Sequence, residues 1–150
     1  MNEFLCYSVE DTLYLGKKIG SFLRGGEIFG LCGELGSGKT MFVKGVAIGL
    51  GYDGYVKSPT FTIINQYQTQ HVSLIHIDIY RLTTFEELML IGYESYLSED
   101  YVVVIEWFDK FPELSKYPHM KIDFEYVDTS VRRLKFYSNF ARYNELLKQL

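Results

Sequence analysis

The sequence predicts an α/β fold in three layers, with helices on both faces of a mixed, mostly parallel sheet. Three observations support this. A glycine-rich loop at 33–40 joins an apolar run to a segment with helix-compatible residues. Strand-like and helix-like segments alternate along the chain, with two pairs typical of hairpins. The run 101–105 is almost entirely β-branched, as expected of a central parallel strand that is buried on both faces.

The loop at 33–40 fits the pattern G-x-x-x-x-G-K-[ST] at every fixed position. Its glycines let the backbone bend and bring several N–H groups to one phosphate chain. Lys39 is expected to lie exposed at the loop mouth and to reach the outer phosphates, while the Thr40 hydroxyl can ligate Mg²⁺. A strand at 28–32 and a helix at 41–50 supply the required context, so we predict the P-loop NTPase fold. The residues expected to hold the nucleotide are Glu34, Leu35, Gly36, Ser37, Gly38, Lys39, Thr40 and Met41.

The composition is typical of one soluble domain over residues 1–150, with 47% hydrophobic and 23% charged residues. The net charge of -4 and the lack of a basic tract argue against tight binding of DNA or RNA by this chain alone. Neither a signal peptide nor a membrane span is evident, so we expect a cytoplasmic protein. Cys6 and Cys32 lack a metal-ligand spacing and are expected to be reduced thiols.

Before the loop, residues 3–7 are predicted to form a short edge strand. Ser8 is the expected N-cap of an amphipathic helix that runs to about residue 23, with Asp11 as its capping-box partner. After the loop helix, Ser58-Pro59-Thr60-Phe61 has the composition of an irregular loop. This loop is either a plain connector or a switch-like segment that closes over Mg²⁺ and the γ-phosphate, with Ser58 and Thr60 as its polar residues.

Residues 62–68 and 72–78 are predicted to pair as a β-hairpin. Alternation places His76, Asp78 and Tyr80 on one face of the second strand, which either supports Mg²⁺ or faces solvent. A short helix is predicted at 83–92. The strand at 101–105 ends on Glu106, which would lie beside the phosphate loop as a Mg²⁺-linked or water-orienting carboxylate, unless it is simply exposed.

The last third of the chain is predicted to form a second hairpin from residues 119–126 and 131–137. Ser138 is the expected cap of a final helix that runs to residue 150. The apolar side of that helix would be formed by Phe140, Tyr143 and Leu147.

Several classes of phosphate-loop protein have further sequence motifs, whose absence from this chain argues against those classes. The GTPase motif D-x-x-G and the transporter signature L-S-G-G-Q are both absent. A small-molecule P-loop kinase normally closes an arginine-rich lid, and this chain has few arginines. Such a kinase and a nucleotide-gated binding module nevertheless stay open as alternative functions.

Four motifs occur together and in order, and they resemble a particular family. They are the loop at 33–40, Ser58-Pro59-Thr60-Phe61-Thr62, His76-Ile77-Asp78-Ile79-Tyr80-Arg81 and Ile105-Glu106-Trp107. Over residues 8–137 the chain is similar to the bacterial TsaE family, also called YjeE or YdiB. That resemblance implies a small ATPase, weak alone and stimulated by partners, that supports the TsaD and TsaB proteins in making N6-threonylcarbamoyladenosine (t6A) in tRNA.

The resemblance also implies roles for individual residues. ATP and Mg²⁺ are the expected ligands, with Lys39 on the phosphates and Thr40, Asp78 and Glu106 near the metal. Glu106, together with Lys39, is expected to support hydrolysis. Arg133 would lie on the nucleotide side of the late hairpin. The other matched motif residues are His76, Tyr80, Arg81 and Trp107. The tRNA is expected to be met only indirectly, through the complex, and no membrane is involved.

Overall fold

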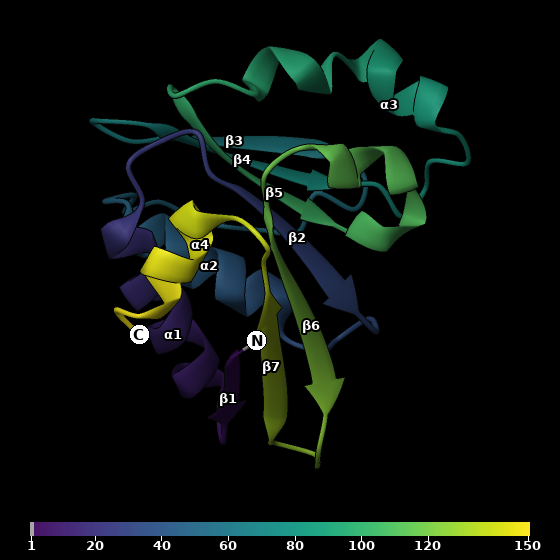
Figure 1. Ribbon diagram of the computed structural model, residues 1–150. Coiled ribbons are helices and arrows are strands. Elements are labelled where there is room, and N and C mark those ends of the chain that lie inside the picture. Colours follow the sequence, from purple (N-terminus) through teal and green to yellow (C-terminus); the bar gives the residue numbers. More distant parts are fainter. Residues whose placement is uncertain (1) are drawn as a thin grey trace.

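A computed structural model describes residues 2–150 and shows a seven-stranded sheet with helices on both faces (Figure 1). The strand order is β1-β7-β6-β2-β5-β4-β3. The strands are β1 (Asn2–Cys6), β2 (Ile28–Gly33), β3 (Ile64–Gln68), β4 (Ser73–Asp78), β5 (Tyr101–Glu106), β6 (Met120–Tyr126) and β7 (Arg132–Tyr137). The helices are α1 (Val9–Phe22), α2 (Lys39–Gly49), α3 (Phe85–Ile91) and α4 (Ala141–Leu147).

The centre of the sheet is parallel and its edges are antiparallel. β5 pairs in parallel with both β2 and β4, and β2 also pairs in parallel with β6. The two hairpins, β3–β4 and β6–β7, and the pairing of β1 with β7 supply the antiparallel edges. The predicted α/β fold with its mixed sheet is therefore confirmed, and so are both hairpins and the edge strand near the N-terminus.

Each face of the sheet has its own hydrophobic core. The helices α1, α2 and α4 cover one face, where Val102 and Val104 of β5 point. The other face packs against α3 and short 3-10 turns at 93–96, 108–110 and 112–116, with Val103 and Ile105 of β5 between them. Alternate residues of β5 thus enter the two cores, so the central strand is buried on both faces as predicted.

Glycines allow α1 and α2 to pack backbone against backbone. Gly16 and Gly20 of α1 face Gly45 and Gly49 of α2. A methyl group on Gly45 would run into the carbonyl oxygen of Leu13, and one on Gly16 into that of Phe42. Because this contact has no room for a side chain, the helix that follows the phosphate loop is held tightly on α1.

The predicted start of the last helix is wrong. α4 begins at Ala141, and its N-cap is Phe140, which offers no side-chain cap. The Ser138 hydroxyl instead donates to the His119 carbonyl at 2.9 Å and accepts from the Phe140 N–H at 3.2 Å. Ser138 therefore fastens the end of β7 to the start of β6. Within residues 2–150, no helix is long and apolar enough to cross a membrane.

Candidate nucleotide site

The phosphate loop lies between β2 and α2, and its glycines adopt conformations that other residues rarely take. The φ angles of Gly33, Gly36 and Gly38 are 144°, 78° and 104°. Gly38 is the N-cap of α2 and provides no side-chain hydrogen bond to the first turn. The first N–H groups of a helix have no partner within the helix, so this end of α2 is suited to bind an anion.

The Lys39 side chain is buried, with a residual exposure of 4%, so the expectation of an exposed lysine is wrong. Its Nζ donates to the Gly33 carbonyl at 2.7 Å and lies 4.6 Å from the centroid of the Trp107 ring. Glu106 Oε1 is 3.9 Å away. Burial lowers the pKa of the Lys39 ammonium, while Glu106 and Asp78 oppose that effect.

Two acids converge beside this lysine from neighbouring strands. Asp78 ends β4 and Glu106 ends β5, and the two are paired in register. Both are buried, as is His76, so a solvent-facing polar strand is excluded. Burial raises the pKa of the Asp78 carboxyl, and the Tyr80 N–H, which donates to Oδ1 at 3.0 Å, opposes that rise. The carboxylates and the Thr40 hydroxyl in the first turn of α2 are oxygen ligands of the kind that Mg²⁺ prefers.

The loop before β3 is tied to one of these acids. Thr60 Oγ1 lies 3.5 Å from Asp78 Oδ2 and 2.7 Å from the Ser58 hydroxyl. The carbonyl of Ile63 accepts the Asp78 N–H at 2.8 Å. Ile63 has a φ of 69°, a strained conformation for a β-branched residue. The structure therefore brings the predicted switch-like loop against Asp78.

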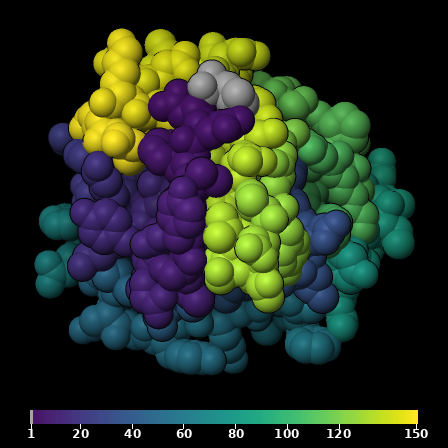
Figure 2. Space-filling model, turned by 90° about the horizontal axis from the view of Figure 1, so that it is seen from below, coloured from purple at the N-terminus to yellow at the C-terminus, as the bar shows by residue number. Residues whose placement is uncertain are grey.

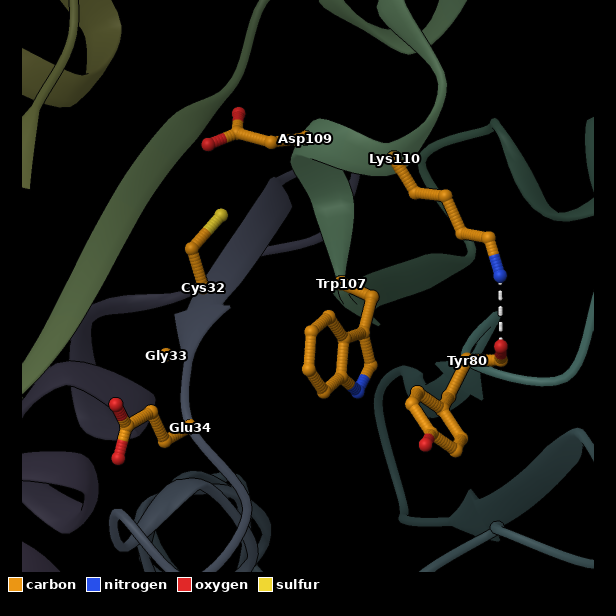
Figure 3. Close-up of a pocket in the computed structure, with 7 residues that line it drawn as sticks. All are labelled: Cys32, Gly33, Glu34, Tyr80, Trp107, Asp109 and Lys110. Atoms are coloured by element: carbon orange, nitrogen blue, oxygen red, sulfur yellow. Dashed lines mark hydrogen bonds between the residues drawn. The ribbon is translucent and has the colours of Figure 1, made fainter.

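A cavity of about 620 Å³ opens between the ends of β2 and β5 (Figure 3). Trp107 and Tyr80 form one side of it, with their ring centroids 5.0 Å apart. Trp107 has a φ of 64°, in the left-handed region, and donates its backbone N–H to the Leu31 carbonyl. This backbone conformation places the indole ring beside Lys39. Arg81 lies over the Phe61 ring at 4.4 Å instead of pointing at the acids.

The late hairpin, β6–β7, contacts the phosphate loop through Tyr126, which lies outside the four motifs that resemble the family. Tyr126 donates its hydroxyl to the Leu35 carbonyl at 3.3 Å, and Arg132 lies over the Tyr126 ring at 4.0 Å. Arg133, the predicted ligand, points to the opposite face and pairs with Glu3 and Glu125. The alternation of side chains along β7 could have predicted this difference between the two arginines. Position 132 lies on the same face of the sheet as the buried Leu134 and Phe136, and position 133 lies on the other face.

A second cavity, of about 320 Å³, lies between this hairpin and the start of α1. Figure 2 shows these segments side by side, the N-terminal region in purple and the hairpin in yellow-green. The cavity adjoins the phosphate loop directly. Its lining includes Tyr7, Ser8, Thr12, Gly36, Gly38, Met41, Thr129, Ser130 and Arg132.

The remaining predicted loop residues differ in exposure. Leu35 is 81% exposed, whereas Ser37 is fully buried and its hydroxyl has no hydrogen-bond partner among residues 2–150. Glu34 lines the larger cavity. Near it, Cys32, Asp109 and Asp123 form a cluster in which Lys121 Nζ already pairs with Asp109 at 2.8 Å. Burial raises the pKa of the Cys32 thiol to about 12, so we interpret this cluster as an ion pair beside an inert thiol.

The strand–loop–helix unit at the centre of a mixed sheet, with acids at the ends of the adjacent strands, defines the P-loop NTPase fold. A family model described as "Threonylcarbamoyl adenosine biosynthesis protein TsaE" matches residues 6–134. The chain belongs to the TsaE family.

Relatives and a solved structure agree with this assignment. The chain is 35% identical over 139 residues to the "tRNA threonylcarbamoyladenosine biosynthesis protein TsaE" of Aquifex aeolicus, covering 91% of this chain and 96% of the relative. It is 33% identical to the protein of the same name from Bacillus subtilis, covering 94% of this chain and 88% of the relative. The crystal structure of Bacillus subtilis YdiB superimposes with a TM-score of 0.82 at 28% identity, covering 99% of this chain and 92% of YdiB.

Proposed function

We propose that this chain binds and hydrolyses Mg-ATP to support a TsaD–TsaB complex in the t6A modification of tRNA in the cytoplasm. The observation that carries the proposal is the convergence of Lys39, Asp78 and Glu106 beside the phosphate loop. The names of the relatives, all of which refer to tRNA threonylcarbamoyladenosine biosynthesis, supply the pathway.

In this proposal the chain's own groups divide the work. Backbone N–H groups of the loop and the Lys39 ammonium bind the phosphates. In the free protein the Lys39 Nζ donates to the Gly33 carbonyl instead. Thr40, Asp78 and Glu106 hold Mg²⁺, which supplies neutralisation of phosphate charge when it is bound. Glu106 Oε1, the oxygen on the side of Lys39, orients the attacking water.

We assign the nucleoside to the 320 Å³ cavity beside the loop. Its lining combines the hydroxyls of Ser8 and Thr12 with the planar guanidinium of Arg132, which suits ribose hydroxyls and an aromatic base. Arg132, in place of Arg133, is then the arginine on the nucleotide side.

The site lacks an arginine directed at the acids among residues 2–150. Arg142 pairs with Glu27 at 2.9 Å, at the opposite end of β2, and Arg81 stacks on Phe61. An arginine supplied to a phosphoryl-transfer site is worth about 10³–10⁵ in rate. We therefore propose that hydrolysis is slow until a partner docks. Leu35, Phe61 and Tyr80 are exposed around the site and offer the apolar contacts for such docking.

The test is ATP turnover at saturating Mg-ATP, measured for the chain alone and then with TsaD and TsaB added. We expect slow release of ADP and phosphate that the partners accelerate at least tenfold. Fast turnover that the partners leave unchanged would contradict partner completion of the site. Transfer of the γ-phosphate to a metabolite in place of water would establish the kinase alternative. Tight nucleotide binding without turnover in any mixture would favour a nucleotide-gated binding module.

A further inference from the structure

His76 is a fully buried histidine that the proposed chemistry does not use. It lies two residues before Asp78 on β4, on the face of the sheet that packs against α1 and α2. Its Nε2 is 2.6 Å from Glu106 Oε2. Its Nδ1 is buried and has no hydrogen-bond partner among residues 2–150. The imidazole therefore has a single polar contact, and that contact is the carboxylate of the site.

The hydrogen-bond pattern determines where the imidazole proton lies. A carboxylate only accepts hydrogen bonds, so we assign the proton to Nε2, which donates to Glu106. A second proton on Nδ1 would be a buried donor without an acceptor, which is costly. The Nε2–H group is accordingly the donor in the contact with Glu106.

This single hydrogen bond divides the two oxygens of Glu106 between two environments. Oε2 is held by His76, and Oε1 lies on the side of Lys39, at 3.9 Å from Nζ. The terminal torsion of a glutamate is broad, so a free carboxylate would rotate over a wide range. With Oε2 fixed, the remaining lone pairs of Glu106 are directed at the phosphate side.

We propose that His76 is a positioning residue for Glu106: its Nε2–H holds one carboxylate oxygen so that the other faces the reacting groups. The role rests on the proposed ATP hydrolysis, in which Glu106 orients water or Mg²⁺. A purely structural role fits the geometry less well. Leu74 and Val104, at neighbouring positions on the same face, are fully buried apolar residues, and an apolar side chain at 76 would avoid burying an imidazole with an unpartnered nitrogen.

Three substitutions separate positioning from packing. His76→Gln retains an N–H donor near the place of Nε2, His76→Leu removes it, and His76→Asn keeps a polar amide that is too short to reach Glu106. Loss of an outer hydrogen-bond partner typically reduces activity or metal affinity by about 10–100-fold. We expect kcat for Mg-ATP hydrolysis to fall by that factor in His76→Leu and His76→Asn, with KM for ATP nearly unchanged and with His76→Gln within a few-fold of the parent.

The same comparison in a Glu106→Gln background tests whether His76 acts through Glu106. There the His76 substitutions are expected to have no further effect on single-turnover hydrolysis. Circular dichroism melting identifies the folded variants; if His76→Leu does not fold, His76→Asn carries the comparison. His71→Gln, at an exposed position, is the matched control. Parent turnover absent both alone and with TsaD and TsaB would refute the proposed function. Parent turnover that is present, with equal kcat in folded Gln, Leu and Asn variants, would refute the positioning role alone.

Discussion

Asp78 and Glu106 stand directly opposite each other at the ends of β4 and β5, paired in register across the parallel ladder. Their surroundings nevertheless differ. Asp78 contacts the loop at Thr60 and the Tyr80 N–H, whereas Glu106 contacts His76 and faces Lys39. Two adjacent carboxylates with different partners are expected to have separable roles.

Glu106→Gln should slow hydrolysis far more than it weakens ATP binding. The amide keeps the shape of the side chain but is a poor acceptor for the proton of an attacking water, and such proton transfer contributes typically 10²–10⁴-fold. We expect kcat to fall by about 10²-fold or more. Calorimetric titration with ATP and Mg²⁺ measures binding separately. An unchanged kcat would remove Glu106 from the mechanism.

Asp78→Asn should instead weaken nucleotide binding in the presence of Mg²⁺ and leave binding without Mg²⁺ almost unchanged. The reason is that the substitution removes a charged oxygen ligand and retains the acceptor for the Tyr80 N–H. Titrations with Mg²⁺ and with EDTA give the two affinities. Equal losses in both conditions would argue that Asp78 acts on the loop and not on the metal.

The Asp78→Asn substitution is also expected to change the thermal stability of the metal-free protein. Burial raises the folded-state pKa of Asp78 above its ordinary value of 3.8. A carboxyl whose pKa rises on folding contributes stability that is present below the unfolded-state pKa and is lost as the pH rises through the folded-state pKa. At pH 7 without Mg²⁺, Asp78→Asn should therefore melt at a higher temperature than the parent, and the gain should vanish below about pH 4. Thermal melts across pH 3–8 check the sign.

Lys39→Ala should abolish ATP-dependent function while the fold persists. Removal of one desolvated phosphate contact is expected to reduce the rate by roughly 10²-fold or more. Since Lys39 is buried against Trp107 and Gly33, we also expect the loop to rearrange locally. Turnover and far-ultraviolet circular dichroism are the measurements. A well-folded Lys39→Ala protein with parental turnover would contradict the assignment of the phosphate site.

Gly45→Ala should destabilise the protein, although alanine is normally the better helix former. The new methyl would meet the Leu13 carbonyl across the α1–α2 contact, and overpacking costs typically 1–3 kcal/mol. Urea unfolding of Gly45→Ala gives the free energy directly. Lys17→Ala, at an exposed position of α1, is the control and should stay within about 0.5 kcal/mol of the parent. A parental midpoint for Gly45→Ala would show that the two helices can separate.

The sequence predicts most of the fold because its patterns are local. The β-branched run 101–105, the glycine loop and the alternation in β4 depend on neighbours along the chain. The burial of Lys39 could not be predicted from such local patterns, because it depends on Trp107, which is distant in the sequence. Trp107 follows β5 and has a left-handed backbone conformation that places its ring over Lys39. The predicted helix cap at Ser138 is wrong for a similar reason: its hydroxyl donates to the His119 carbonyl, nineteen residues earlier, and α4 begins only at Ala141.

Trp107 also gives the molecule an optical property. It is the only tryptophan of the chain, and its indole lies against the Lys39 ammonium on one side and the Tyr80 ring on another. A phosphate that draws Lys39 away from the Trp107 ring changes the charge next to the indole. A partner that covers Tyr80 changes the exposure of the indole to water. Excitation at the red edge of the indole band therefore reports both events, without a label, from one defined position in the structure.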